Sequence, residues 1–129
     1  MSFASDISKY AKKTKLSMDD AVVAINTQLT NDIIVGTPVD SGRARGNWYP
    51  SISKPSNEVN LEAEDKSGAG AISEAQNVAK GSSGTVFYLT NNLKYIKRLE
   101  YGWSNQAPSG FMRRAIKNME TTLKKFKGN

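Results

Sequence analysis

The stretch from Met18 to Gly36 constrains the fold of this chain more than any other. Its apolar residues recur at the 3.6-residue period of an α-helix, at Met18, Val22, Ile25, Leu29 and Ile33. Ser17 is suited to cap the helix, and Asp19 and Asp20 lie in the first turn, where the helix dipole favours negative charge. Gly36 and Pro38 then form a stop signal. The pattern predicts a long helix whose apolar stripe packs into a core.

A shorter amphipathic helix is predicted before it. Phe3, Ile7 and Tyr10 follow helical spacing over Phe3–Ala11, and a basic cluster comes next. Residues 3–36 therefore form an N-terminal helical region. A chain of 129 residues is near the usual size of one domain, so we expect a single domain over residues 1–129.

The segment Thr37–Trp48, TPVDSGRARGNW, follows the long helix. Pro38 cannot continue a helix, and Asp40 or Ser41 can accept backbone N–H bonds in a turn. Arg43 and Arg45 lie two residues apart between glycines, and two interpretations stay open. The segment is either a rigid loop whose arginines grip carboxylates or phosphates, or a helix-to-strand connector whose arginines are solvated.

Three segments have the composition of β-strands. Gly46–Ser53 contains Trp48, which is large enough to anchor a core, and Pro50, which favours an edge or a bulge. A second strand is predicted where apolar residues alternate with polar ones, at Val59, Leu61 and Ala63. This strand lies in a region, residues 54–70, that we otherwise expect to be flexible. Thr85–Thr90, TVFYLT, is β-branched and aromatic on both faces, so we place it centrally in a sheet.

Three further helices are predicted in the second half of the chain. Ala71–Ala79 has helix propensity and is followed by Gly81. Leu93–Tyr101 has helical spacing, with Gly102 as its C-cap. Pro108 precedes the last helix, Phe111–Phe126, whose apolar stripe lies opposite a basic face.

Glu100 is the residue of this half that most requires a partner. It falls near the apolar side of its helix, between Leu99 and Tyr101, where an unpaired buried carboxylate would be unfavourable. Arg43 or Arg45 could supply the positive charge, from the same chain or from a neighbouring subunit. We call residues Thr37–Trp48 the arginine loop. We therefore expect an ion pair between the arginine loop and the helix that contains Glu100.

The sequence has no Cys and no His. It therefore lacks a thiolate nucleophile, the commonest general base and the commonest transition-metal ligand. The only group of three closely spaced carboxylates, Glu62, Glu64 and Asp65, fits a solvated surface better than a metal or acid–base site. We expect no enzymatic activity, no metal and no cofactor.

No apolar run is long enough for a signal peptide or a membrane span, so we expect a soluble protein that is made in a cytoplasm.

Charge is distributed unevenly along the chain. The net charge is +6, and residues 94–129 contain nine Lys or Arg against two Glu, whereas residues 54–80 contain three Lys against five acidic residues. Such a chain can bind acidic partners or copies of itself head to tail. The basic last helix, Arg113–Lys127, keeps a second function class open, a small DNA-binding accessory protein, although no known DNA-binding motif is present.

Two stretches together resemble a known family. Pro38–Trp48 fits the pattern PVD(S/T)GRxRxxW after a long first helix, Tyr95–Gly102 fits YxxxLEYG, and Gln106–Phe111 fits QAPxG(F/M) before a final helix. In this order and separation the motifs resemble the tail-completion family of long-tailed bacteriophages, also called neck or minor tail proteins. The resemblance covers most of the chain from residue 18 onward and leaves Lys54–Lys80 unconstrained.

The resemblance implies a structural virion protein at the joint between tail and head. It implies an α+β fold, with a small antiparallel sheet packed against the long N-terminal helix and the C-terminal helix. It also implies a hexameric ring, with a tail terminator or tail tube protein on one side and a head-completion or connector protein on the other. Viral DNA would pass through the lumen without sequence-specific binding, no membrane would be involved, and assembly would take place in the host cytoplasm. The interface residues it suggests are Asp40, Arg43, Arg45, Trp48, Glu100, Tyr101, Gly102 and Pro108.

Overall fold

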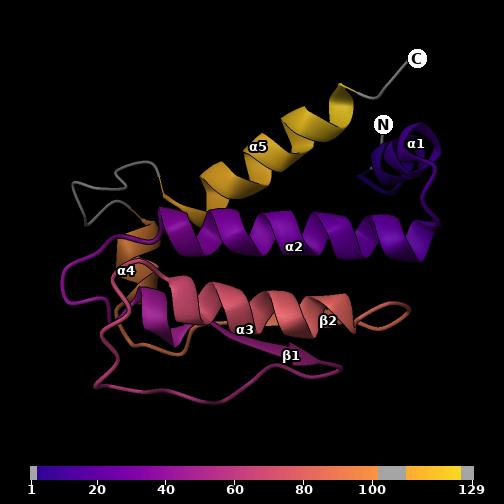
Figure 1. Cartoon of the computed structure of the whole chain (residues 1–129). Coiled ribbons are helices and arrows are strands. Elements are labelled where there is room, and N and C mark those ends of the chain that lie inside the picture. Colours follow the sequence, from indigo (N-terminus) through magenta and orange to yellow (C-terminus); the bar gives the residue numbers. More distant parts are fainter. Residues whose placement is uncertain (1–2, 102–109, 126–129) are drawn as a thin grey trace.

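A two-stranded sheet packs against a group of helices in the computed structural model, which describes residues 3–101 and 110–125 (Figure 1). The elements follow in the order α1 (Phe3–Thr14), α2 (Met18–Gly36), a short 3-10 helix η1 (Arg45–Asn47), β1 (Tyr49–Ile52), α3 (Ala69–Lys80), β2 (Phe87–Thr90), α4 (Ile96–Glu100) and α5 (Met112–Lys124). The predicted α+β class is confirmed.

The long helix α2 is the centre of the molecule. Figure 1 shows α5 crossing one side of it and α3 lying along the other, with α1 beside its N-terminal end. The Ser17 hydroxyl accepts the N–H of Asp20 at 3.1 Å, which confirms the predicted N-cap. The helix extends through Gly36, and Thr37 is its C-cap, with its N–H bonded to the carbonyl of Ile34 at 3.2 Å. Gly36 is therefore the last residue of the helix, and the C-cap is Thr37 rather than Gly36.

Two apolar clusters make the core. The larger joins α2, α3, the residue before β1 and the start of α5, through Ile33, Ile34, Trp48, Ala71, Ala75, Phe111 and Ala115. The smaller joins the other half of α2 to α5, through Ile25, Met119 and Leu123, with Ile7 and Tyr10 of α1 packed against it. On α3 the buried stripe is Ala71, Ala75 and Ala79, and these small side chains let α3 approach α2 closely.

The sheet is smaller than the sequence suggested. β1 and β2 pair antiparallel, with Tyr49 opposite Thr90 and Ile52 opposite Phe87, and α3 packs along β1. Since the described residues contain only these two strands, the central placement of Thr85–Thr90 is wrong. The residues of β2 are half-buried, and Leu89 packs against the larger core cluster.

The predicted strand over Val59–Ala63 is also wrong. The Asn47 side chain binds both backbone groups of Asn60, and Asn60 in turn accepts the N–H groups of Glu62 and Ala63, so the chain turns here. Val59 and Leu61 alternate in sequence but both remain exposed. Residues 54–70, which were expected to be flexible, are attached to the arginine loop at several points.

The helix predicted for Leu93–Tyr101 is shorter than expected. Asn91 accepts the N–H of Leu93 at 3.2 Å, and its amide donates to the carbonyl of Ala44 at 2.9 Å. This side-chain turn competes with helix formation, so α4 begins only at Ile96. The predicted C-cap Gly102 and the predicted Pro108 lie outside the described residues. In residues 3–101 and 110–125 no helix combines the length and the apolar character that crossing a membrane requires.

Candidate functional site

The structure brings the two motif-bearing stretches together at one end of α2. The rings of Trp48 and Phe111 meet edge to face, with centroids 6.2 Å apart and planes at 80°. Trp48 is only 3% exposed, and its indole N–H donates to the Thr37 hydroxyl at 2.9 Å, which donates to the carbonyl of Ile33 at 2.7 Å. We call this region, residues 37–48, 91–101 and 110–113, the motif junction.

Glu100 is buried in the motif junction at the N-terminus of α5. Its Oε1 accepts the N–H groups of Phe111 at 2.8 Å and Met112 at 2.7 Å, and its Oε2 accepts the N–H of Arg113 at 3.1 Å. The Arg113 guanidinium adds an ion pair to Oε2 at 2.8 Å and a bond to the Glu100 carbonyl. The first N–H groups of a helix have no partner within the helix and favour a negative charge. Glu100 therefore caps α5 from a different element, α4.

These bonds set the ionisation of the carboxyl. Burial alone would raise the pKa of Glu100, but the hydrogen bonds from Met112, from the Arg113 side chain and from the Arg113 and Phe111 N–H groups outweigh it, so the pKa lies below the ordinary value of 4.5. The Arg113 guanidinium also lies 5.0 Å from the centre of the Tyr101 ring, a cation–π contact.

Gly110 makes this close approach possible. Its φ is +86°, and a Cβ there would lie 2.7 Å from both the carbonyl and Oε2 of Glu100. Any other residue would combine backbone strain with a clash against the carboxylate that caps α5. The glycine in the motif QAPxG thus has a defined structural role.

Arg45 binds backbone carbonyl groups rather than a carboxylate. Its guanidinium donates to the carbonyls of Val35 at 2.6 Å, Thr37 at 2.8 Å and Lys66 at 2.8 Å. The first two are carbonyls at the C-terminal end of α2, where a positive charge is favourable. Arg45 therefore caps α2 and ties it to residue 66. Both interpretations drawn from the sequence were incomplete, because neither included backbone carbonyls as the ligands.

The prediction of an ion pair between Glu100 and the arginine loop of the same chain is wrong. Arg113 takes the place expected for Arg43 or Arg45, and Arg45 is committed to carbonyls. In the sequence Arg113 is one of several basic residues of the last helix, and only its position in the first turn, where Glu100 binds the N–H groups, distinguishes it. The position of Glu100 on the buried side, 8% exposed, was predicted correctly.

Asn47 is the other residue that the sequence did not reveal. It is fully buried, and its amide donates to the carbonyls of Arg43 at 2.7 Å and Asn60 at 2.8 Å, while its oxygen accepts the N–H of Asn60 at 2.7 Å. Gly42 strengthens the same link, because its carbonyl accepts the N–H of Asp65 at 3.2 Å. No local pattern identifies such a residue, since its partners are distant in the chain.

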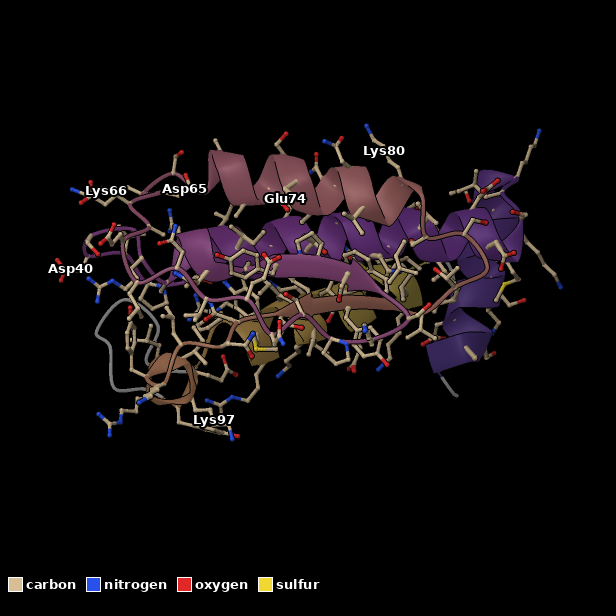
Figure 2. All side chains as sticks on the ribbon, turned by 90° about the horizontal axis from the view of Figure 1, so that it is seen from below. Asp40, Asp65, Lys66, Glu74, Lys80 and Lys97 are labelled. Carbon is tan, nitrogen blue, oxygen red and sulfur yellow. The ribbon has the colours of Figure 1, made fainter. Side chains whose placement is uncertain are left out.

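Of the predicted residues that the structure describes, the remaining three are exposed. Asp40 and Arg43 are exposed, and Tyr101 is 66% exposed. A cavity of about 500 Å³ separates the arginine loop from α4, and it is lined by Pro38, Val39, Asp40, Ser41, Arg43, Ala44, Tyr95 and Leu99. Figure 2 shows Asp40 at the outer end of its loop and Lys97 projecting from α4. The junction thus divides into an internal set of caps and an external set of residues that a partner can reach.

The described residues hold no group of three acidic, His or Cys side chains placed to bind a metal ion. Glu62 and Glu64 are exposed, and the Asp65 carboxylate accepts the N–H of Ala71 at 3.0 Å in the first turn of α3. Comparisons of the chain with protein-family models, with curated proteins and with solved structures found no match.

Proposed function

We propose that this chain is a structural virion protein at the head-to-tail joint of a long-tailed phage. It completes the tail and joins it to the head by assembling as a ring around the DNA channel. The observation that carries the proposal is the motif junction. The two stretches that resemble the tail-completion family are far apart in the sequence, yet they share one core contact, Trp48 with Phe111, and one cavity.

The roles of the motif residues support a rigid assembly unit. Arg45 and Glu100 fix the ends of α2 and α5, so the loop and α4 are held in one geometry. Asp40, Arg43 and Tyr101 are presented outward from that rigid base. A ring contact is heterologous, and it needs two different surfaces of fixed geometry on each subunit. We assign one of these surfaces to the exposed residues of the motif junction.

Electron microscopy of lysates tests the proposal. A phage in which this gene is interrupted should accumulate filled heads beside separate, full-length tails. Supplying the wild-type gene from a plasmid should restore joined particles, and Arg43→Ala should restore far fewer although it folds. Lys80→Ala is the matched control, because Lys80 is exposed at the opposite end of α3 from the junction (Figure 2). Normal joined particles from the interrupted phage would exclude the proposed function.

The DNA-binding alternative has one observation in its favour. Exposed basic residues occur on α5 and on the neighbouring α1, at Arg114, Lys117, Lys124, Lys12 and Lys13. A DNA-binding protein would bind duplex DNA as a monomer, with an affinity that falls steeply with salt. We expect weak binding by the free chain, because a ring lumen contacts DNA only after the ring exists.

A further inference from the structure

The outer edge of β2 has unpaired backbone groups. Ser53 donates its N–H to the carbonyl of Val86 at 2.9 Å, one step beyond the last strand pair, Ile52 with Phe87. In an antiparallel pair, hydrogen-bonded positions alternate, so Tyr88 and Thr90 bond to β1 while the N–H and C=O groups of Phe87 and Leu89 point away from it. Within the described chain these groups of Phe87 and Leu89 have no hydrogen-bond partner.

In residues 3–101 and 110–125, this edge lacks the usual protection. Residues 86–90, VFYLT, include no charge, no Pro and no Gly, and Val86 is 60% exposed. The helix α3 packs along β1, and β2 lies on the side of the sheet away from it (Figure 2). Exposed edges in natural proteins are normally covered or carry charges and prolines, because bare edges pair with other chains. An uncharged, bare edge therefore indicates an interface.

The other edge of the sheet cannot serve as its partner. On β1 the outward-pointing positions are Pro50 and Ile52, and Pro50 has no N–H to donate. If β2 paired head to tail with β1 of a second copy, one hydrogen bond would be missing at Pro50. If β2 paired with β2 of a second copy, every outward N–H and C=O group would have a partner. Antiparallel pairing about a two-fold axis at Tyr88 places Phe87 opposite Leu89 of the second copy and Leu89 opposite its Phe87, and each pair exchanges two hydrogen bonds.

An apolar cavity adjoins β2 on the inner face of the sheet. It measures about 290 Å³ and lies between β2, α4 and α5, lined mainly by Trp48, Leu89, Ile96, Tyr101 and Met112. Leu89 packs against the larger core cluster, so it lies on the inner face of the sheet. Residues directly opposite each other in a ladder share a face. Phe87 of a second copy would therefore stand beside Leu89 at the mouth of this cavity.

We infer that the outer edge of β2 is a self-association site, at which two copies form one continuous four-stranded sheet and each inserts Phe87 beside the other's cavity. The contact is isologous and closes on itself, so it is separate from the ring contact. It goes beyond the proposed function and does not depend on it.

Sedimentation equilibrium of the purified full chain tests this inference. The wild-type chain should show a concentration-dependent dimer. Tyr88→Lys and Tyr88→Glu should each be mainly monomeric, because like charges would face each other across the axis, and an equimolar mixture should form mixed dimers roughly tenfold tighter than either alone. Tyr88→Gln, which adds no charge, is the control and should still form dimers. A monomeric wild-type chain, or variants as dimeric as the wild type, would overturn the inference.

Amide exchange of the wild-type chain gives a second reading that needs no variant. The N–H groups of Phe87 and Leu89 should become protected as concentration rises, whereas those of Tyr88 and Thr90 should be protected at every concentration. Equal exchange of Phe87 and Leu89 at low and high concentration would also overturn the inference. Either failure would leave the head-to-tail joining proposal standing, since that is read from particle assembly.

Discussion

The Glu100 carboxylate combines burial with full ionisation, which a lone buried carboxylate cannot do. Three backbone N–H groups and the Arg113 guanidinium supply the solvation that water would give. Arg113 is itself more than half exposed, so the N–H groups rather than the ion pair dominate the stabilisation. At the scale of single residues, Glu100 is the group on which the geometry of the motif junction depends most.

Replacing Glu100 with Gln should lower the stability of the fold. The amide can still accept from Phe111 and Met112, but its NH2 group would face the N–H and the guanidinium of Arg113, and the charge would be lost. We expect a loss of about 2 kcal/mol in the free energy of unfolding, as for hydrogen bonds to a charged group. Urea denaturation measures it, and Glu120→Gln on the exposed face of α5 is the control, expected within about 0.5 kcal/mol of wild type.

The same carboxylate predicts a pH dependence. Because the pKa of Glu100 is lower in the folded than in the unfolded chain, its contribution to stability is complete above its ordinary value of pH 4.5 and is lost as the pH falls below it. The difference in urea midpoint between wild type and Glu100→Gln should therefore shrink as the pH is lowered from neutral to below 4.5. A gap between the two proteins that stays constant over this range would contradict the assigned role.

At the scale of elements, helix ends decide how the motif stretches are held. The C-terminal carbonyls of α2 are capped by Arg45 and the N-terminal N–H groups of α5 by Glu100. Each cap comes from outside the helix that it serves. Such a cap couples the end of one helix to a separate segment of the chain. We therefore expect the ends of α2 and α5, the arginine loop and α4 to fold and unfold together.

The two arginines of the loop should behave differently. Arg45→Ala leaves the carbonyls of Val35, Thr37 and Lys66 without their donor and should reduce the free energy of unfolding by about 2 kcal/mol. Arg43 is exposed, and Arg43→Ala should change stability by less than about 0.5 kcal/mol. Thermal or urea unfolding of the pair compares them directly. Equal losses in both variants would mean that the cap at α2 does not stabilise the fold.

The sequence predicts those elements whose signals are local. The Ser17 cap and the apolar period identify α2, and the stripe of the last helix identifies the buried residues Ala115, Met119 and Leu123 of α5. The two segments that were confirmed as strands contain aromatic side chains next to the core. These features follow from spacing alone, without knowledge of what lies opposite.

Contacts between distant segments account for what the sequence did not predict. Asn47 holds Asn60 thirteen residues away and prevents the strand expected there. Opposite charge alone points to Arg43 or Arg45 as the partner of Glu100, whereas the N–H groups at the start of α5 are its partners in the structure. Both errors have one origin: Asn47 and Glu100 bind backbone groups of distant segments, which no local pattern indicates.

At the scale of the whole molecule, the chain presents three distinct surfaces. The exposed residues of the motif junction lie at one end of α2, and α1, which carries the exposed Lys12 and Lys13, lies beside the other end. The bare edge of β2 lies on the sheet, away from α3. In the proposed ring, the motif junction contacts a neighbouring subunit, whereas the edge of β2 forms the separate two-fold contact. The exposed basic residues suit a surface that faces DNA without reading its sequence.

The most direct test of the central claim is a joining assay with purified components. Filled heads and separate tails from a phage with this gene interrupted are mixed with the purified protein, and joined particles are counted by electron microscopy and by infectivity. The account predicts that wild-type protein converts heads and tails into joined, infectious particles, and that Lys80→Ala does so equally well while Arg43→Ala does not. Heads and tails that stay separate after the wild-type protein is added would contradict the claim that this chain joins them.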